Sequence, residues 1–145
     1  RAFWHADFLR AGWCARYWPD RHSAVEYLQS RSLFQSWHPE ALGAYVDHAL
    51  KTDAGELQLK CRPEREAEIF SSYPKGLWPA LRKAAAPISV FYGEQTFPFV
   101  VKAVAKWQQL NPAVQATQVA GGHCFMQEHP RDTAARVKVT LLGYR

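Results

Sequence analysis

A strand–helix–strand–loop–helix succession in the second half of the sequence, over residues 87–142, indicates the fold class. Residues 87–93 read Pro-Ile-Ser-Val-Phe-Tyr-Gly, a short β-branched and aromatic run between Pro and Gly that predicts a buried strand. A second strand is predicted over 114–119, and residues 120–123, Ala-Gly-Gly-His, predict a tight loop after it. The helix between the strands is predicted from Pro98, with an apolar stripe of Val100, Val104, Trp107 and Leu110. The last helix is predicted from Pro130 to about Leu142, with Gly143 as its stop.

Strands that alternate with helices of this length predict parallel pairing in an α/β sheet. Two parallel strands make a poor sheet by themselves, because their outer edges stay unpaired and a parallel sheet normally has both faces covered. We therefore expect the chain to be part of a larger α/β fold.

The first half of the sequence predicts mainly helices. Ser23 and Glu26 have the spacing of a capping box, in which Ser23 caps the helix and Glu26 reaches back to it. The other predicted elements are helices over 6–18, 39–50, 63–70 and 75–86, and an extended segment over 56–61.

His123 is the residue with the clearest potential for chemistry. Catalytic groups in open α/β sheets lie beyond the carboxyl ends of the strands, where this histidine is predicted. Two glycines before it allow a sharp turn, and an imidazole can take and return a proton at neutral pH. A histidine that merely lines the loop fits these observations equally well.

The second half of the sequence resembles the final section of α/β-hydrolases. The residues that carry the resemblance are 87–94, which end in Gly-Glu, and 121–130, which read Gly-Gly-His-Cys-Phe-Met-Gln-Glu-His-Pro. Family members typically have a strand that ends in Gly-x-x-acid, then a strand, a loop of the form Gly-His-x-x-x-x-Glu-x-Pro, and a helix. The resemblance implies that 74–145 is the carboxy-terminal part of an α/β-hydrolase core, and that 1–73 is a mainly helical, cap-like region.

The resemblance also implies a Ser-His-acid triad, in which His123 is the general base that activates the nucleophile. Glu128 would hold the histidine loop, and Pro130 would begin the closing helix. We expect Phe97 and Phe125 to bind the substrate.

Two parts of this triad are not found in the sequence. No serine lies in a Gly-x-Ser-x-Gly motif, so we expect the nucleophile to belong to a missing amino-terminal half of the fold. The usual acid position, three residues after Gly93, holds Thr96, which carries no charge. Glu94 is the nearest carboxylate, but an exposed loop position explains it better. We therefore expect the acid upstream of Arg1.

We expect the complete protein to hydrolyse an ester or a related bond of an apolar small molecule without a cofactor, and this chain alone to be inactive. Hydrolysis of an epoxide, a carbon–halogen bond or a carbon–carbon bond remains an alternative. Another is a catalytically incomplete module that binds an apolar ligand, which Thr96 favours slightly.

Composition excludes several other classes of function. The net charge of +5 comes from scattered basic residues and forms no dense stripe, which disfavours a nucleic-acid partner. The histidines share no ligand spacing, and the three cysteines form no Cys-x-x-Cys pair, so we expect neither a metal site nor a disulfide framework. Cys124 is expected to be a small, buried side chain. No membrane span or signal peptide is recognisable, and we expect a cytoplasmic location.

Overall fold

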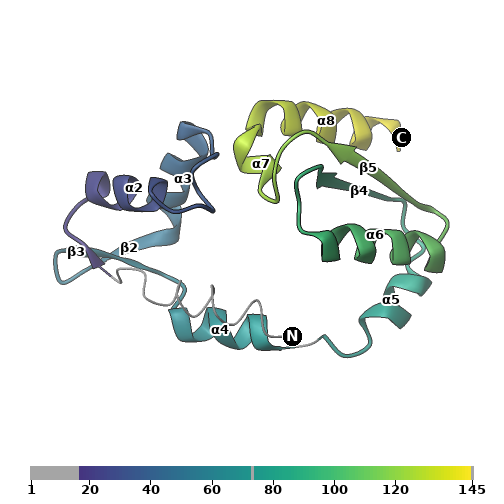
Figure 1. Cartoon of the computed structure of the whole chain (residues 1–145), viewed down its shortest axis with the longest axis horizontal. Helices are drawn as coiled ribbons and strands as arrows, with labels where there is room; N and C mark the ends of the chain where they lie inside the picture. The colour runs from purple at the N-terminus through teal and green to yellow at the C-terminus, as the bar shows by residue number, and fades with distance from the viewer. Residues whose placement is uncertain (1–16, 73, 145) are drawn as a thin grey trace. The chain divides into compact units, whose positions relative to one another are not determined.

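The computed structural model describes residues 17–72 and 74–144 (Figure 1). The chain divides into two compact units, and each is described by itself. Among the described residues, the amino-terminal unit comprises 17–35, 42–72 and 74. The carboxy-terminal unit comprises 36–41 and 75–144.

The carboxy-terminal unit contains the predicted alternation of strands and helices. Its elements are α5 (Leu77–Lys83), β4 (Ile88–Gly93), α6 (Pro98–Leu110), β5 (Val114–Val119), α7 (Phe125–Glu128) and α8 (Pro130–Gly143). Strands β4 and β5 pair in parallel, from Ile88 opposite Val114 to Gly93 opposite Val119. Because the pairing is parallel and in register, the carboxyl ends of both strands lie next to each other. Helices α6 and α8 are drawn on opposite sides of this strand pair (Figure 1).

The core of this unit is apolar, with one buried amide. Val104 of the predicted α6 stripe is buried, together with Val114, Val119 and Phe125. The Asn111 amide, which is 8% exposed, donates to the carbonyl oxygens of Leu81 and Ala84, at 3.3 and 2.9 Å. It thereby satisfies backbone carbonyls at the end of α5, and the Leu81 carbonyl also accepts from Trp107 Nε1 at 3.4 Å.

Some element boundaries in this unit differ from those predicted. Helix α5 is shorter than 75–86, because Gly76 has a left-handed backbone (φ +76°) before it and Ala84 is extended after it. Gly143 is the last residue of α8 and not the stop after it. The short helix α7 was not predicted.

The amino-terminal unit combines helices with a small antiparallel sheet. Its elements are β1 (Tyr17–Trp18), α2 (Arg21–Gln29), α3 (Pro39–Ala49) from Leu42 onward, β2 (Leu50–Asp53), β3 (Glu56–Leu59) and α4 (Pro63–Ser71). The strand order is β1-β3-β2. Strands β2 and β3 form a hairpin through Ala54 and Gly55, both with positive φ, as a two-residue turn of type I′ requires.

Three predictions for the amino-terminal unit were wrong. Tyr17 and Trp18 pair with β3 as a strand and do not end a helix, whereas the rest of the predicted helix, 6–16, lies outside the described residues. Asp20, and not Ser23, caps α2, because its carboxylate accepts the Ser23 N–H at 2.8 Å. The helix from Pro39 ends at Ala49, because Leu50 begins β2 and pairs with Leu59.

None of the helices within 17–72 and 74–144 combines the length and the apolar character that a membrane span requires.

Candidate active site

The site forms where β4 and β5 end side by side. Beyond the last residue pair of the strands, the N–H of Glu94 donates to the Val119 carbonyl at 2.8 Å. The next N–H, of Gln95, donates to the Gly121 carbonyl at 3.0 Å. The loop after β4 is thus joined to the histidine loop by backbone hydrogen bonds.

Gly93 allows this close approach. A Cβ atom at position 93 would lie 1.9 Å from the backbone oxygen of Gly122 and 2.7 Å from that of Gly121. Any side chain would therefore force the two loops apart.

Thr96 is the hydrogen-bond partner of His123. The Thr96 N–H donates to the Gly93 carbonyl at 3.1 Å, which closes a four-residue turn after β4. This turn places Thr96 Oγ1 2.9 Å from Nδ1 of His123. The residue at the usual acid position thus contacts the histidine, but through a neutral hydroxyl.

An aromatic side chain lies against the imidazole. The ring of Phe97 is tilted by 53° to the ring of His123, with 4.8 Å between the centroids, and it stacks on Phe99 at 5.6 Å. Phe97 and Phe99 are 37% and 49% exposed, and His123 is exposed as well. Phe125, the other residue expected to bind the substrate, is buried at 8% exposure, and its contact with a substrate stays a prediction.

Glu128 holds the histidine loop. Its Oε2 accepts the Gly122 N–H at 2.7 Å, and its Oε1 accepts the Ser36 hydroxyl at 3.1 Å. Gly121 has φ +114°, and Cβ atoms at positions 121 and 122 would lie 2.8 and 2.6 Å from this carboxylate. Both glycines are therefore required for the carboxylate to reach the loop backbone.

The segment Ser36–Ala41 packs beside this loop, a contact that was not predicted from the sequence. Besides the bond from Ser36, the His38 N–H donates to the Gln127 carbonyl at 2.9 Å, and Arg131 forms a 3.1 Å ion pair with Glu40. Ser36 and Glu128 are 92 positions apart. No local pattern connects residues at such a separation.

Two other side chains near His123, the Cys124 thiol and the Glu94 carboxylate, are candidates for nucleophile and acid. Burial raises the pKa of the Cys124 thiol, and the charge of Glu128 raises it further, which outweighs the opposite effect of a bond from Trp37. The thiol is therefore protonated at neutral pH. Glu94 is exposed, and its carboxylate has no hydrogen bond or ion pair with another described residue.

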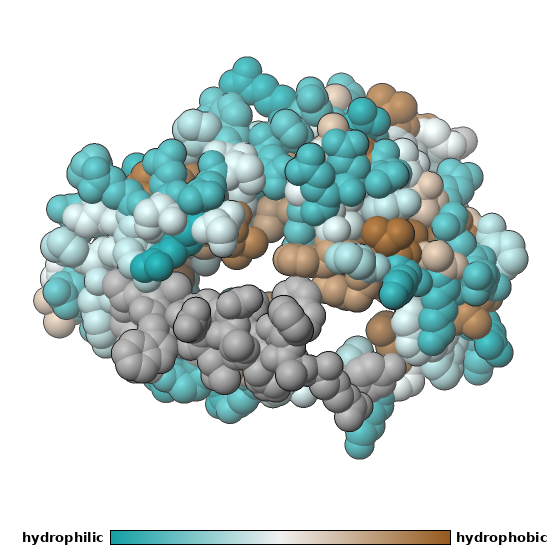
Figure 2. Space-filling view, in the orientation of Figure 1, coloured by the Kyte–Doolittle hydropathy of each residue, from teal (hydrophilic) through white to brown (hydrophobic). Residues whose placement is uncertain are grey.

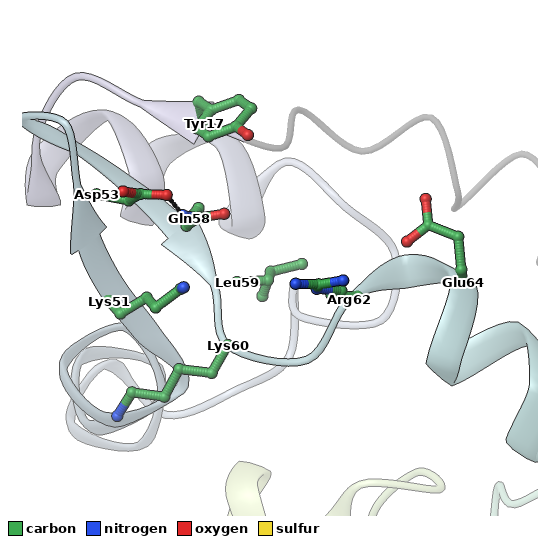
Figure 3. A pocket seen from close by; sticks show the side chains of 8 residues that line it. All are labelled: Tyr17, Lys51, Asp53, Gln58, Leu59, Lys60, Arg62 and Glu64. Carbon is green, nitrogen blue, oxygen red and sulfur yellow. Dashed lines mark hydrogen bonds between the residues drawn. The ribbon is translucent and has the colours of Figure 1, made fainter.

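A hollow lies in the amino-terminal unit (Figure 3), whereas the residues described above belong to the chain's other unit. Its volume is about 470 Å³, and its lining residues are Tyr17, Lys51, Asp53, Gln58, Leu59, Lys60, Arg62 and Glu64. Lys60 Nζ donates to the His48 carbonyl at 2.6 Å, and Gln58 donates to Asp53. This lining has neither a histidine nor a serine or cysteine nucleophile. Nor do three His, Cys, Asp or Glu side chains gather as a metal site anywhere in 17–72 or 74–144.

Comparison with known proteins identifies the fold. No family model matches the sequence, and no curated protein matches it either. Among solved structures, E-2-(acetamidomethylene)succinate hydrolase is similar with a TM-score of 0.72 and 20% identity, over 90% of this chain and 48% of the hydrolase. The thioesterase domain from the curacin biosynthetic pathway is similar with a TM-score of 0.64 and 14% identity, over 90% of this chain and 50% of that domain.

The chain thus spans about half the length of the structures that it resembles. The predicted fold class is confirmed: the chain has the fold of part of an α/β-hydrolase.

Proposed function

We propose that this chain supplies the general base of a hydrolase, His123, and that the nucleophile comes from a part of the protein outside this chain. The observation that carries the proposal is the position of His123: exposed, beyond the carboxyl end of β5, with Nδ1 bonded to Thr96. An imidazole held at one nitrogen can take the proton of a nucleophile at the other and then return it to the leaving group.

The surroundings of His123 favour an apolar substrate. Phe97 and Phe99 leave aromatic surface exposed beside the imidazole, and covering one such side chain contributes about 1.5–3 kcal/mol. We therefore propose an ester, or a related bond such as a thioester, next to an apolar group. Phe97 would contact that group, and we propose that Phe125 contacts it as well.

The test compares two histidines in the complete protein, with nitrophenyl esters of increasing acyl length as substrates. His123→Ala should lower kcat by about 10⁴-fold or more, because the nucleophile then stays protonated. His129→Ala is the matched control, since His129 is also exposed and immediately precedes the neighbouring helix α8. It should keep most of the activity. Equal rates for His123→Ala and the unaltered protein would contradict the proposal.

A second candidate function is the binding of an apolar ligand without chemistry. The observation that favours it is the neutral Thr96 hydroxyl where a triad has a charged acid. In that case the complete protein would bind fatty-acyl or aromatic ligands in calorimetry. It would show no turnover, and His123→Ala would leave the affinity nearly unchanged.

A further inference from the structure

We infer that Thr96 is the positioning residue of His123: its hydroxyl accepts a hydrogen bond from the Nδ1–H group, which leaves Nε2 unprotonated and able to act as the base. The inference rests on the proposed function, which requires a general base at this histidine. It differs from the expectation that an acid upstream of Arg1 holds the imidazole.

The hydroxyl of Thr96 is itself held in place. Its backbone is fixed by the Thr96–Gly93 hydrogen bond, and the preceding residue is fixed by the Gln95–Gly121 hydrogen bond. As a β-branched residue, threonine also has a restricted χ1 angle. The hydroxyl is therefore presented to Nδ1 by a rigid turn, in the way that a positioning group must be.

The proposed role of His123 requires one direction of this hydrogen bond. A neutral imidazole has one N–H donor and one acceptor nitrogen, and a hydroxyl can either donate or accept. If Thr96 donated to Nδ1, the ring proton would be on Nε2, and this nitrogen could not take a proton. For His123 to act as a base at Nε2, Nδ1 must carry the proton and Thr96 must accept it.

No carboxylate among the described residues competes for Nδ1. Both oxygens of Glu128 are bonded elsewhere, to Gly122 and Ser36. Glu94 is exposed and has no bond to His123. A carboxylate from outside the chain would have to displace the Thr96 hydroxyl to reach this nitrogen.

The test uses the complete protein and two substitutions that separate the hydroxyl from the shape of the side chain. Thr96→Val keeps the shape, and Thr96→Ser keeps the hydroxyl. With the nitrophenyl ester as substrate, Thr96→Val should lower kcat about ten-fold with little change in KM, as expected for the loss of one neutral hydrogen bond. Thr96→Ser should restore kcat to within about two- to three-fold of the unaltered protein, because it can still form this bond.

A spectroscopic measurement reads the tautomer directly. In ¹⁵N NMR of the imidazole, the unaltered protein should show the proton on Nδ1, and Thr96→Val should shift the population toward Nε2. A proton on Nε2 in the unaltered protein would overturn the inference, even if the valine variant failed to fold. Unchanged kcat and tautomer in Thr96→Val would overturn it as well, and would favour the upstream acid.

The two proposals fail in different ways. If His123→Ala abolishes activity and Thr96→Val does not change it, the proposed function stands and the role of Thr96 is wrong. If His123→Ala keeps full activity, the proposed function itself is wrong.

Discussion

At the scale of single residues, Glu128 links three segments through one carboxylate: the histidine loop, α7 and Ser36. Both oxygens serve as acceptors of hydrogen bonds, one from the loop backbone and one from Ser36. The contribution of Glu128 to stability can be measured separately from the contribution of His123 to activity.

Glu128→Ala should destabilise the protein by about 1–3 kcal/mol, because the Gly122 N–H then loses its partner in a partly buried loop. Chemical denaturation measures this change. Glu40→Ala is the control, since the exposed Glu40–Arg131 ion pair should contribute at most about 1 kcal/mol. Equal losses for the two variants would argue against a special role of Glu128.

The cysteines should differ in their reactivity. Cys124 is partly buried and its pKa is raised by that burial, whereas Cys61 is exposed. A raised pKa means that less of the Cys124 thiol is ionised at a given pH, and the thiolate is the reactive form. With iodoacetamide at mildly alkaline pH, Cys61 should be alkylated first. A Cys14→Ser background removes the third cysteine, and mass spectrometry of peptides gives both rates. Faster labelling of Cys124 would contradict the expectation.

The site could be predicted in part at this scale. His123 and the contact of Glu128 with its loop follow from one short motif, in which the residues are five positions apart. Thr96 was recognised only as a missing charge, because the sequence does not show that its hydroxyl reaches Nδ1. That contact depends on the parallel register of β4 and β5, which brings together residues 27 positions apart.

At the scale of elements, the close approach of the two strand ends requires Gly93. Gly93→Ala should destabilise the protein by roughly 1–3 kcal/mol or more, because its Cβ would meet backbone and not a flexible side chain. Thermal melting followed by circular dichroism checks this. Gly143→Ala is the matched control: nothing lies within 4 Å of its added Cβ, and it is in a helix. It should be neutral or stabilising, by up to about 1 kcal/mol. If Gly93→Ala behaved like this control, the loops could not be as close as described.

Helices α2 and α3 are joined by an ion pair that should make the amino-terminal unit sensitive to acid. Arg21 Nε and Nη2 donate to the two carboxylate oxygens of Asp47, at 2.6 and 3.1 Å. These bonds hold the pKa of Asp47 below its ordinary value of 3.8. Since the folded-state pKa is lowered, the stabilisation is present above that value and is lost as the pH falls below it.

Asp47→Asn should therefore lower the melting temperature slightly near neutrality, where the ion pair is present, and leave it unchanged in strong acid, where Asp47 is protonated; the melting temperature of the variant should thus depend less on pH in the range below about 4. Melting curves across this range measure the effect. Asp132→Asn is the control, because Asp132 lies on α8 in the other unit. Identical pH profiles for Asp47→Asn and the unaltered chain would show that this pair does not act on stability.

The elements of the carboxy-terminal unit were more predictable than those of the amino-terminal unit. Pro87, Gly93 and Pro98 bound β4 and begin α6, so local signals and tertiary structure agree there. Strand β2 follows α3 without a break, and its pairing with β3 outweighs the apolar pattern that predicted a helix as far as Leu50. Strand β1 likewise depends on a partner some 40 positions later in the chain.

At the scale of the whole molecule, the chain leaves apolar surface uncovered. β4 pairs with β5 alone among the described strands. Val137, Val139, Leu141 and Leu142 of α8 are all at least 42% exposed, and hydrophobic atoms lie at the surface between hydrophilic ones in Figure 2. A groove of about 320 Å³ runs between β4 and α8 and includes Ile88, Phe91, Val137 and Leu141. Because the chain spans about half of the similar structures, we propose that the remaining part of the fold covers this groove.

One leucine and one valine on α8 test whether the groove is covered in the complete protein. Leu141 lines the groove and is 62% exposed in this chain, whereas Val139 is 71% exposed and does not line it. If another segment fills the groove, Leu141→Lys places a charge in an apolar contact and should destabilise the complete protein by about 1–3 kcal/mol. Val139→Lys should change the stability by no more than about 0.5 kcal/mol, as is usual at the surface. Chemical denaturation of both variants gives the comparison. In the 145-residue chain by itself neither substitution should matter, since the groove is open to water there. Equal stability of the two variants in the complete protein would mean that nothing packs against this groove.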